Sequence, residues 1–436
     1  MISDTATQLS LKDVQDAVSG TSAAFRCRRR LQPAGGEGDK VFPPTFAGAV
    51  YAVEQRRVPG HEQPVTCVLL DSVQSQANRM EQALQEALDA GDITLPVIAV
   101  DFSEHGPTGD SKKDEEEGRL LDAIGRVTSL QVPHRLADAI LRDSEHNGEP
   151  FRKSSAALNE ASALKATALY ERCPTALVFG MWDSTGPKRG LGAKFERAIV
   201  SEVVGLRAEV GDLLRGVRRD PLEIRANIQV RKLEDKDPTG RTFEVLGANV
   251  KGGVNPSKVN HSSVPFPETR DEKTDKNRYS GVTIGYAEQT TTLSLICLRR
   301  LRFPQMRFPR LEEESAQPKR DQNAVNAAGH AVLAALGLCA ATLAFESGMG
   351  LRSRCLLWPD EPMRWELLAK PGETPKSFTL DAAAAKKLLA VAGAAAEQAG
   401  LRWIVEPLNL NPSKELLKLV RLSQQQAVKE GTAEES

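Results

Sequence analysis

Residues 176–205 read ALVFGMWDSTGPKRGLGAKFERAIVSEVVG, and this stretch decides the organisation that we expect for the chain. Its opening, residues 176–181, is a short apolar run that predicts a strand. Residues 183–187 have turn chemistry and end that run. A helix is predicted to follow, because apolar residues then recur at helical spacing. They are Leu191, Phe195, Ala198 and Ile199.

The basic residues of this stretch lie in and after the predicted turn. Lys188 and Arg189 stand among the glycines, and Lys194 and Arg197 are three apart on one face of the predicted helix. A helix N-terminus beside such a turn collects backbone N–H groups and cations, which suits a phosphate. A nucleotide-hydrolysing P-loop is not predicted, because Ala193 follows the last glycine. The other interpretation is a tight turn with a solvated basic face.

A second polar cluster opens a helix earlier in the chain. Residues 64–70 predict a buried strand, and residues 73–88 predict a helix with a regular apolar stripe. The start of this helix is rich in hydroxyl, amide and guanidinium donors, as contact with a sugar–phosphate backbone requires. The alternative is a capped surface helix. The polar residues concerned are Ser72, Ser75, Gln76, Asn78 and Arg79.

Two predicted strands carry basic residues on one face. In residues 21–31, Arg26, Arg28 and Arg30 alternate with Phe25, Cys27 and Arg29 and therefore form a cationic row. An edge strand that uses charge to block aggregation is the alternative. Residues 222–232 also alternate, which places Arg225 and Arg231 with Asn227 and Gln229 on a second donor-rich face.

The composition excludes several classes of protein. With 57 basic and 58 acidic residues in 436, a nucleic-acid surface requires local clustering of charge. Six cysteines without a C-x-x-C pair argue against zinc and disulfides and indicate a reducing cytoplasm. The N-terminus lacks the features of a signal peptide, and residues 324–345 predict a buried helix rather than a membrane span. We expect a cytoplasmic protein without a membrane anchor, cofactor or metal.

The histidines and serines do not form a recognisable catalytic pattern. The six histidines fall on different predicted elements, and no nucleophile-elbow motif is present. We therefore expect a binding protein, not an enzyme, with no catalytic residues. A histidine beside an RNA strand could act as a general base for attack by a 2′-hydroxyl. His61 and His134 are the candidates for that alternative.

Two blocks of sequence resemble a known family. LLDSVQSQANRMEQAL at residues 69–84 and the block at residues 177–205 are similar to the CRISPR-associated RAMP proteins that form the backbone of the type I-U (I-G) Cascade complex, the divergent Cas-seven family. The resemblance covers most of residues 20–310. It implies an α+β fold: a modified RRM-like (ferredoxin-like) β-α-β-β-α-β core with an antiparallel sheet, large inserted loops including a thumb, and a helical C-terminal extension.

The resemblance also implies a function. Members of the family are non-catalytic subunits that bind CRISPR RNA, multimerise along it with other Cascade subunits, and let target DNA pair with the guide in antiviral defence. Carried over to this chain, the helix that begins at Ser72 and the turn at residues 186–194 would hold guide phosphates. Two alternatives stay open: a RAMP-type endoribonuclease that processes precursor CRISPR RNA, and a nucleotide-binding switch at residues 186–194.

The expected domains and RNA-binding residues follow from both lines of reasoning. We expect an N-terminal helix in 1–20, a palm at 21–310 with a loop at 103–118 and a candidate thumb at 233–276, a linker at 311–322, an α/β C-terminal region at 323–425 packed on the palm, and a disordered tail at 426–436. The predicted RNA-binding residues are Arg26, Arg28, Arg30, Ser72, Ser75, Gln76, Asn78, Arg79, Lys188, Arg189, Lys194, Arg197, Arg225 and Arg231.

Overall fold

The computed structural model of the chain contains two compact units. The first comprises residues 1–104, 124–210 and 281–416, and the second comprises residues 105–123, 211–280 and 417–436. The structure describes residues 6–47, 50–60, 62–155, 158, 160–183, 194–210, 217–218, 221–225, 227–233, 241–259, 261, 264–265, 281–304 and 321–434.

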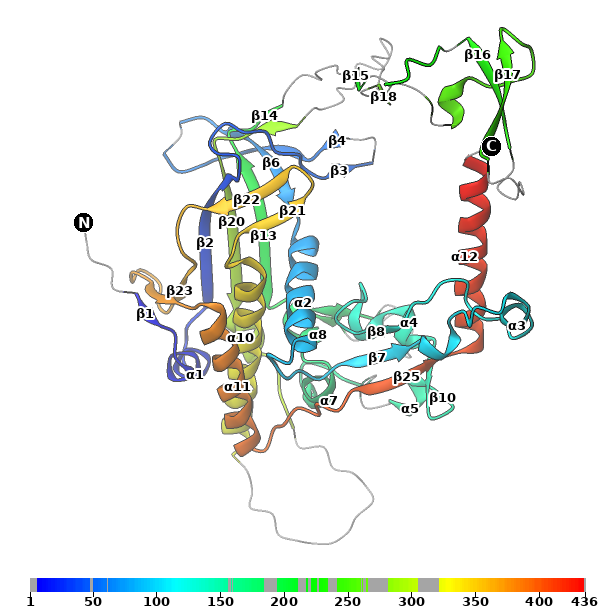
Figure 1. Ribbon diagram of the computed structural model, residues 1–436. Coiled ribbons are helices and arrows are strands. Elements are labelled where there is room, and N and C mark those ends of the chain that lie inside the picture. Colours follow the sequence, from blue (N-terminus) through cyan, green and yellow to red (C-terminus); the bar gives the residue numbers. More distant parts are fainter. Residues whose placement is uncertain are drawn as a thin grey trace. The chain divides into compact units, whose positions relative to one another are not determined.

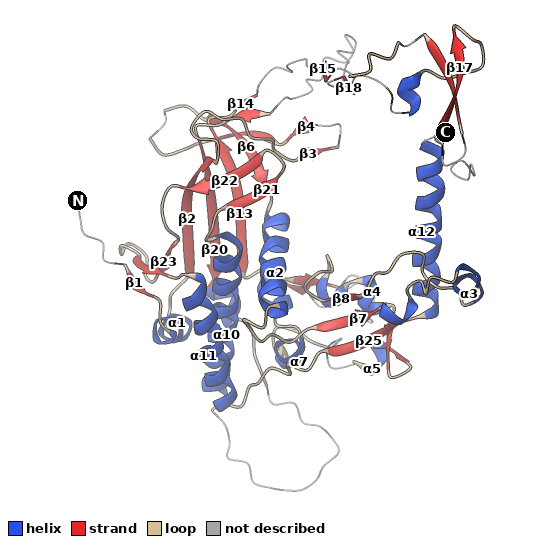
Figure 2. Cartoon of the chain, viewed as in Figure 1, coloured by secondary structure: helices blue, strands red, loops and turns tan. Residues whose placement is uncertain are grey.

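The first unit is built on an RRM-like core. Its four strands stand in the order β23-β2-β20-β13, with neighbours antiparallel, and its two helices α2 and α10 lie on one face of the sheet (Figures 1 and 2). Along the sequence these elements follow in the order β-α-β-β-α-β, which confirms the predicted α+β, RRM-like fold class. The elements are β2 (Ala24–Pro33), α2 (Val73–Asp89), β13 (Ile199–Leu206), β20 (Tyr286–Ser294), α10 (Gln322–Phe345) and β23 (Arg364–Leu368).

The second helix and the fourth strand of this core come from residues beyond 320. The predicted palm at residues 21–310 therefore leaves out α10 and β23, which the sequence assigned to a separate C-terminal region. Long-range pairing with β2 places β23 in the palm sheet, and the same compact unit contains both. The sheet has ten strands, the others being β1 (Thr7–Gln8), β5 (Val53–Arg56), β6 (Val65–Asp71), β21 (Met349–Arg352), β22 (Cys355–Pro359) and β24 (Lys376–Thr379).

The face of β2 that turns toward α10 forms part of the core. Phe25, Cys27 and Leu31 are buried there, and the buried guanidinium of Arg29 donates to the carbonyl oxygen of Phe345 at the end of α10. This alternation confirms the predicted division of β2 into two faces. Helix α10 is long and apolar enough to cross a membrane, but 83% of its most apolar window is buried in the protein. It is therefore the buried helix that the alanine-rich sequence predicts.

His330 makes the stability of this core depend on pH. Burial lowers the pKa of His330 from 6.5 to about 4, and the ring Nε2 lies 2.9 Å from the carbonyl oxygen of Leu301. The unfolded chain takes up the proton first as pH falls, so stability is full above pH 6.5 and declines toward pH 4, by about 3 kcal/mol. We expect His330→Gln to remove this part of the decline. Urea unfolding of both proteins at several pH values tests it, and identical pH slopes would contradict it.

Smaller elements complete the first unit. A five-stranded sheet has the order β10-β9-β25-β7-β8. Its strands are β7 (Ile98–Asp101), β8 (Arg126–Thr128), β9 (Ser144–His146), β10 (Glu149–Pro150) and β25 (Leu408–Pro412). Three further pairs are β3 (Thr45–Phe46) with β4 (Val50–Tyr51), β11 (Met181–Trp182) with β12 (Lys194–Phe195), and β14 (Glu209–Val210) with β19 (Val282–Thr283). The helices are α1 (Leu11–Ser19), α4 (Ala139–Arg142), α5 (Phe151–Ser154), α7 (Thr167–Arg172), α8 (Thr175–Phe179), α9 (Leu295–Arg299) and α11 (Ala382–Gln398).

The described part of the second unit contains a hairpin, two α-helices and the 3-10 helix η3 (Pro256–Val259). Strands β16 (Ile228–Lys232) and β17 (Phe243–Ala248) pair antiparallel. The candidate thumb at residues 233–276 is described at residues 233, 241–259, 261 and 264–265, and its role stays a prediction. A second short pair joins β15 (Val217–Arg218) to β18 (Val264–Pro265).

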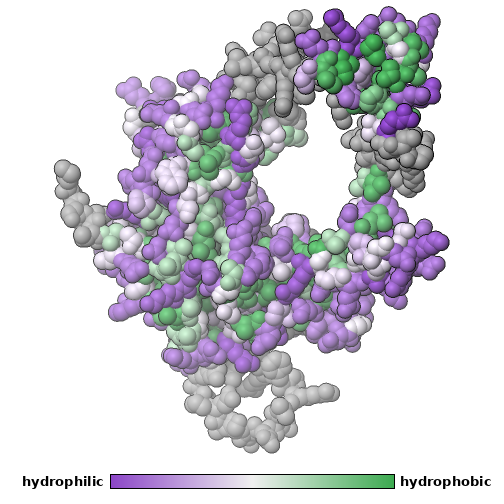
Figure 3. All heavy atoms as spheres, in the orientation of Figure 1, coloured by the Kyte–Doolittle hydropathy of each residue, from purple (hydrophilic) through white to green (hydrophobic). Residues whose placement is uncertain are grey.

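Two segments of this unit are more helical than expected. Helix α3 (Ser111–Glu116), capped by Asp110, forms where a loop was expected at residues 103–118. Helix α12 (Lys414–Glu434) continues through the segment expected to be a disordered tail, because residues 424–430 are mostly good helix formers. Hydrophobic patches lie over α12 in Figure 3, and there Leu419 and Leu422 are exposed.

Candidate nucleic-acid interface

The uncovered face of the palm sheet carries the predicted arginine row. Arg26, Arg28 and Arg30 point away from α10, and the side chains of Arg28 and Arg30 are 52% and 57% exposed. Strand β20 lies beside them and alternates in the same way. We call this surface the open face and define it by the outward side chains of the neighbouring strands. They are Arg26, Arg28 and Arg30 of β2, Tyr286, Glu288 and Thr290 of β20, and Glu202 of β13.

Each arginine of the row has an acidic partner from another strand or turn. Arg26 Nε lies 2.8 Å from Glu366 Oε2, Arg28 Nη2 lies 2.8 Å from Glu288 Oε2, and Arg30 Nε lies 3.3 Å from Asp360 Oδ2. The hydrogen bond from Arg28 to Glu288 raises the pKa of Arg28, so this side chain stays cationic. Arg30 also lies over the ring of Tyr286, 4.4 Å from its centroid. Exposed pairs of this kind contribute little to stability, so a phosphate can replace the carboxylate at small cost.

A groove runs along the open face beside the row. Arg28 and Tyr286 line one side, and Arg56 and Arg57 at the end of β5 line the other. Arg56 Nη1 lies 3.1 Å from Glu202 Oε1 on the floor of the groove. Apolar side chains of Val204 and Leu206 complete that floor. The groove therefore offers guanidinium groups on both sides of a partly apolar surface, as a nucleic-acid strand needs.

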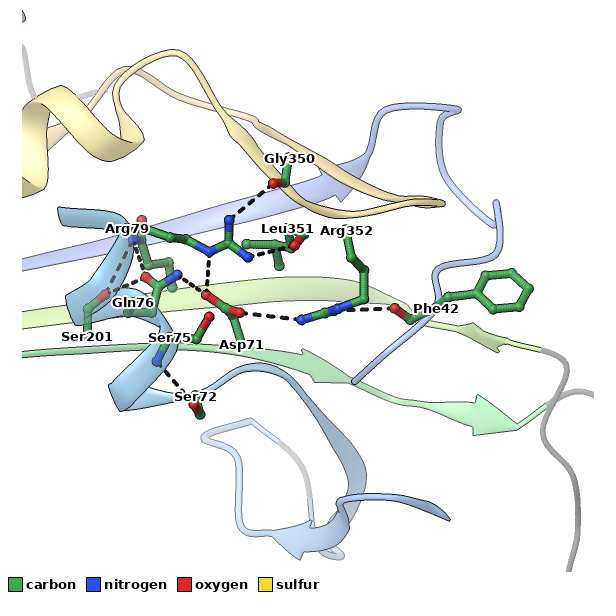
Figure 4. A network of polar contacts seen from close by, with 11 residues as sticks. Phe42, Asp71, Ser72, Ser75, Gln76, Arg79, Ser201, Gly350, Leu351 and Arg352 are labelled. Atoms are coloured by element: carbon green, nitrogen blue, oxygen red, sulfur yellow. Dashed lines mark hydrogen bonds and ion pairs between the residues drawn. The ribbon is translucent and has the colours of Figure 1, made fainter. Parts of the chain in front are cut away.

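Polar side chains at the start of α2 form hydrogen bonds within the protein itself. Asp71, which is 1% exposed, accepts from Gln76 Nε2 at 2.6 Å and from Arg79 Nε at 2.9 Å (Figure 4). Arg79 also donates to the carbonyl oxygens of Gly350 and Leu351, at 3.2 and 2.6 Å. All three of these acceptors belong to the chain itself. The network attaches the β21–β22 hairpin to α2.

Gln76 connects the same network to the sheet. Its Oε1 accepts from Ser201 Oγ at 2.9 Å and from Gln289 Nε2 at 3.1 Å, and the residue is completely buried. Ser201 and Gln289 lie on the covered face of the sheet, so α2 and the arginine row are on opposite faces. Arg79 and the arginine row therefore do not line a common groove. Ser72 caps α2 by accepting from the Ser75 N–H at 3.3 Å, and Asn78 is exposed.

The organising stretch folds differently from the sequence prediction. Residues 175–179 form the buried helix α8, not a strand, because an apolar run of five residues fits a buried helix equally well. Residues 199–206 form β13, not a helix, since four β-branched residues favour a strand. Between them, β11 (Met181–Trp182) pairs with β12 (Lys194–Phe195). The helix N-terminus proposed for phosphate binding is absent from the part of this stretch that the structure describes.

A buried ion pair fixes the base of this β11–β12 ribbon. Arg135 Nε and Nη2 each lie 2.6 Å from a carboxylate oxygen of Glu81, and Arg135 Nη1 donates to the carbonyl oxygen of Gly180 at 2.9 Å. Burial raises the pKa of Glu81, and the Arg135 guanidinium acts against that shift. Gly180 has φ +78°, and a side chain there would meet Arg197 and Phe195. The chain therefore enters the ribbon at a fixed angle.

The predicted basic residues of the stretch have different environments. Lys194 is exposed on β12, opposite Trp182 on β11. Arg197 is half-buried, and burial together with the nearby Arg135 lowers its pKa. Lys188 and Arg189 lie outside the described residues. Sequence reasoning missed Trp182, which is 65% exposed, because the turn signals beside it drew attention to the glycines and lysines.

The palm region also has a match in a known family. Residues 25–210 match the model of the family described as CRISPR-associated protein GSU0053 (Cas_GSU0053). The match covers less than half of the chain and indicates a CRISPR-associated protein family. The match runs from β2 through β14 and contains both sequence blocks on which the resemblance was based. No curated protein is similar enough to this chain to be matched.

The remaining candidate residues are two arginines of the second unit and the two histidines of the endoribonuclease alternative. Arg225 and Arg231 are exposed, and Arg231 Nη1 lies 3.4 Å from Glu244 Oε2 within the β16–β17 hairpin. His134 is exposed beside η2 (Arg135–Ala137), whereas His61 lies outside the described residues. Within the described ranges, His, Cys, Asp and Glu form no cluster of three that could hold a metal.

Proposed function

We propose that this CRISPR-associated protein is a non-catalytic backbone subunit of a type I Cascade complex that binds CRISPR RNA and multimerises along it. The observation that carries the proposal is the open face, where Arg26, Arg28 and Arg30 line an RRM-like sheet. Evenly spaced guanidinium groups contact phosphates without reading sequence. A guide held by its phosphates keeps its bases available for target DNA, so the proposal also accounts for pairing with a target and for other Cascade subunits as partners.

The arginine row supplies the test. We expect Arg28→Ala and Arg30→Ala to weaken binding to all single-stranded RNAs about equally, and each variant that removes one phosphate contact should lower the salt slope by about one. Filter binding at several salt concentrations measures both effects. Lys12→Ala is the control, because Lys12 is an exposed, ion-paired cation on α1, away from the open face. Unchanged slopes in both arginine variants would contradict the proposal.

The non-catalytic part of the proposal is tested separately. The wild-type protein is incubated with precursor CRISPR RNA, and the RNA is separated on a denaturing gel. We expect intact RNA. Cleavage that disappears in His61→Ala or His134→Ala would instead support the endoribonuclease alternative.

Multimerisation has its own readout. Electron micrographs of the protein co-expressed with a CRISPR array should show rows of subunits along the RNA. Single subunits on RNA of any length would contradict the backbone role and leave RNA binding itself intact.

A further inference from the structure

We infer that Trp182 stacks on a base of the bound single-stranded RNA and that Lys194 contacts the adjoining phosphate. This inference rests on the proposed function and adds a second contact surface to it. The two residues lie directly opposite each other on β11 and β12. Opposite residues of an antiparallel pair point to the same side, so the indole and the ammonium group share one surface. An aromatic platform beside a cation is the common arrangement for binding a single strand.

The ribbon is held from its other side. Met181 and Phe195, the neighbours of Trp182 and Lys194, are 7% and 6% exposed and turn inward. Trp182 is 65% exposed, so its indole contributes little to that packing. The sequence thus places a large aromatic side chain in water on a strand whose opposite side is well packed. A single exposed apolar residue is common and does not by itself indicate a binding site. The significance of Trp182 therefore depends on the contacts that fix its backbone.

Ion pairs fix the backbone on both sides of Trp182. On one side, the carbonyl oxygen of Gly180 is held by Arg135, which is itself locked by Glu81. On the other side, both carboxylate oxygens of Asp183 lie 2.9 Å from Arg152 Nη2. A position fixed in this way presents its side chain in one place, which reduces the entropic cost of binding a ligand.

The charges around the ribbon favour an anionic ligand. Asp183 is neutralised by Arg152, and Glu196 by Arg300, whose Nη1 lies 2.8 Å from Glu196 Oε2. Among the described residues, no carboxylate forms an ion pair with Lys194. The cation opposite Trp182 is therefore not compensated by the acids next to it. A protein partner would need an acidic surface there, whereas every nucleotide supplies both a base and a phosphate.

Tryptophan fluorescence tests the inference directly. The full-length protein is titrated with oligouridylate while its emission is recorded. The titration is made in Trp358→Phe, because Trp358 is 61% exposed on β22 and pairs with Gln32 beside the arginine row. We expect quenching in Trp358→Phe and loss of that quenching when Trp182→Phe is added. We expect Trp182→Ala to bind oligouridylate at least about fivefold more weakly, and Trp182→Phe to retain most of the affinity because phenylalanine also stacks.

The outcomes separate this inference from the proposed function. If the wild type binds oligouridylate but quenching persists when Trp182→Phe is added, or Trp182→Ala binds normally, the stacking role is wrong and the proposed function stands. If the wild type binds no RNA, the proposed function fails. Sedimentation without RNA tests whether Trp182 instead contacts another copy of the protein. If Trp182→Ala self-associates more weakly than the wild type but binds RNA normally, the stacking role is wrong. Circular dichroism confirms that the variants fold.

Discussion

Replacing Glu81 with alanine is expected to reduce the free energy of unfolding by about 3–5 kcal/mol, because it leaves the Arg135 cation buried without a counter-charge. Both side chains are almost completely buried, at 3% and 7% exposure, and two contacts of 2.6 Å join them. No other described carboxylate is paired with Arg135. Equilibrium unfolding in guanidinium chloride measures the loss. The midpoint should fall while the slope of unfolding free energy against denaturant concentration stays unchanged.

Two controls make this result interpretable. Asp16→Ala removes the partner of Lys12 from an exposed pair on α1, and we expect no measurable change. The double variant Glu81→Leu with Arg135→Met removes both charges, and its stability should return toward that of the wild type, because a buried ion pair is close to neutral relative to apolar residues. A loss below about 1 kcal/mol in Glu81→Ala would contradict the assigned role.

The periodicity of apolar residues predicted correctly those elements whose structure depends on residues close in the sequence. The alternation of β2, the apolar stripe of α2 and the alanine-rich helix α10 were all correct, because each pattern reflects one buried side. The helix predicted from the spacing of Leu191, Phe195, Ala198 and Ile199 was wrong, because the β-branched residues from Ile199 onward form a strand. Pairing of β13 with β20 and β6 favours the strand over the helix. The membership of β23 in the palm depends on such pairing as well.

The candidate site was harder to predict because its partners are distant in the sequence. Arg26 and Glu366 are 340 positions apart, and Arg79 reaches carbonyl groups 271 and 272 positions away. Sequence reasoning identified a donor-rich helix start correctly but could not show that its acceptors belong to the same chain. The same limit applies to the open face, where the row was predicted but its acidic partners were not. Only the open-face arginines, Lys194 and Trp182 therefore enter the proposed contacts.

Replacing Asp71 with alanine is the other change expected to have a large effect, again a loss of about 3–5 kcal/mol in the free energy of unfolding. Asp71 is buried and accepts from Gln76, Arg79 and Arg352, whose Nη2 lies 3.4 Å from Asp71 Oδ1. Its removal leaves two guanidinium groups without a counter-charge and a buried amide without an acceptor. Thermal unfolding monitored by circular dichroism measures the loss, and a change in melting temperature no larger than that of Asp16→Ala would contradict it.

Arg79→Ala distinguishes the structural role of this network from the phosphate-binding role that the sequence suggested. Asp71 keeps Arg352 and Gln76 when Arg79 is removed, so we expect a smaller destabilisation than in Asp71→Ala. Because the donors of Arg79 are engaged within the chain, the salt slope for RNA binding should equal that of the wild type. Filter binding at a temperature where the variant is folded measures it. A slope reduced by about one with unchanged stability would instead return Arg79 to the RNA surface, because an arginine that contacts phosphate affects counterion release and not folding.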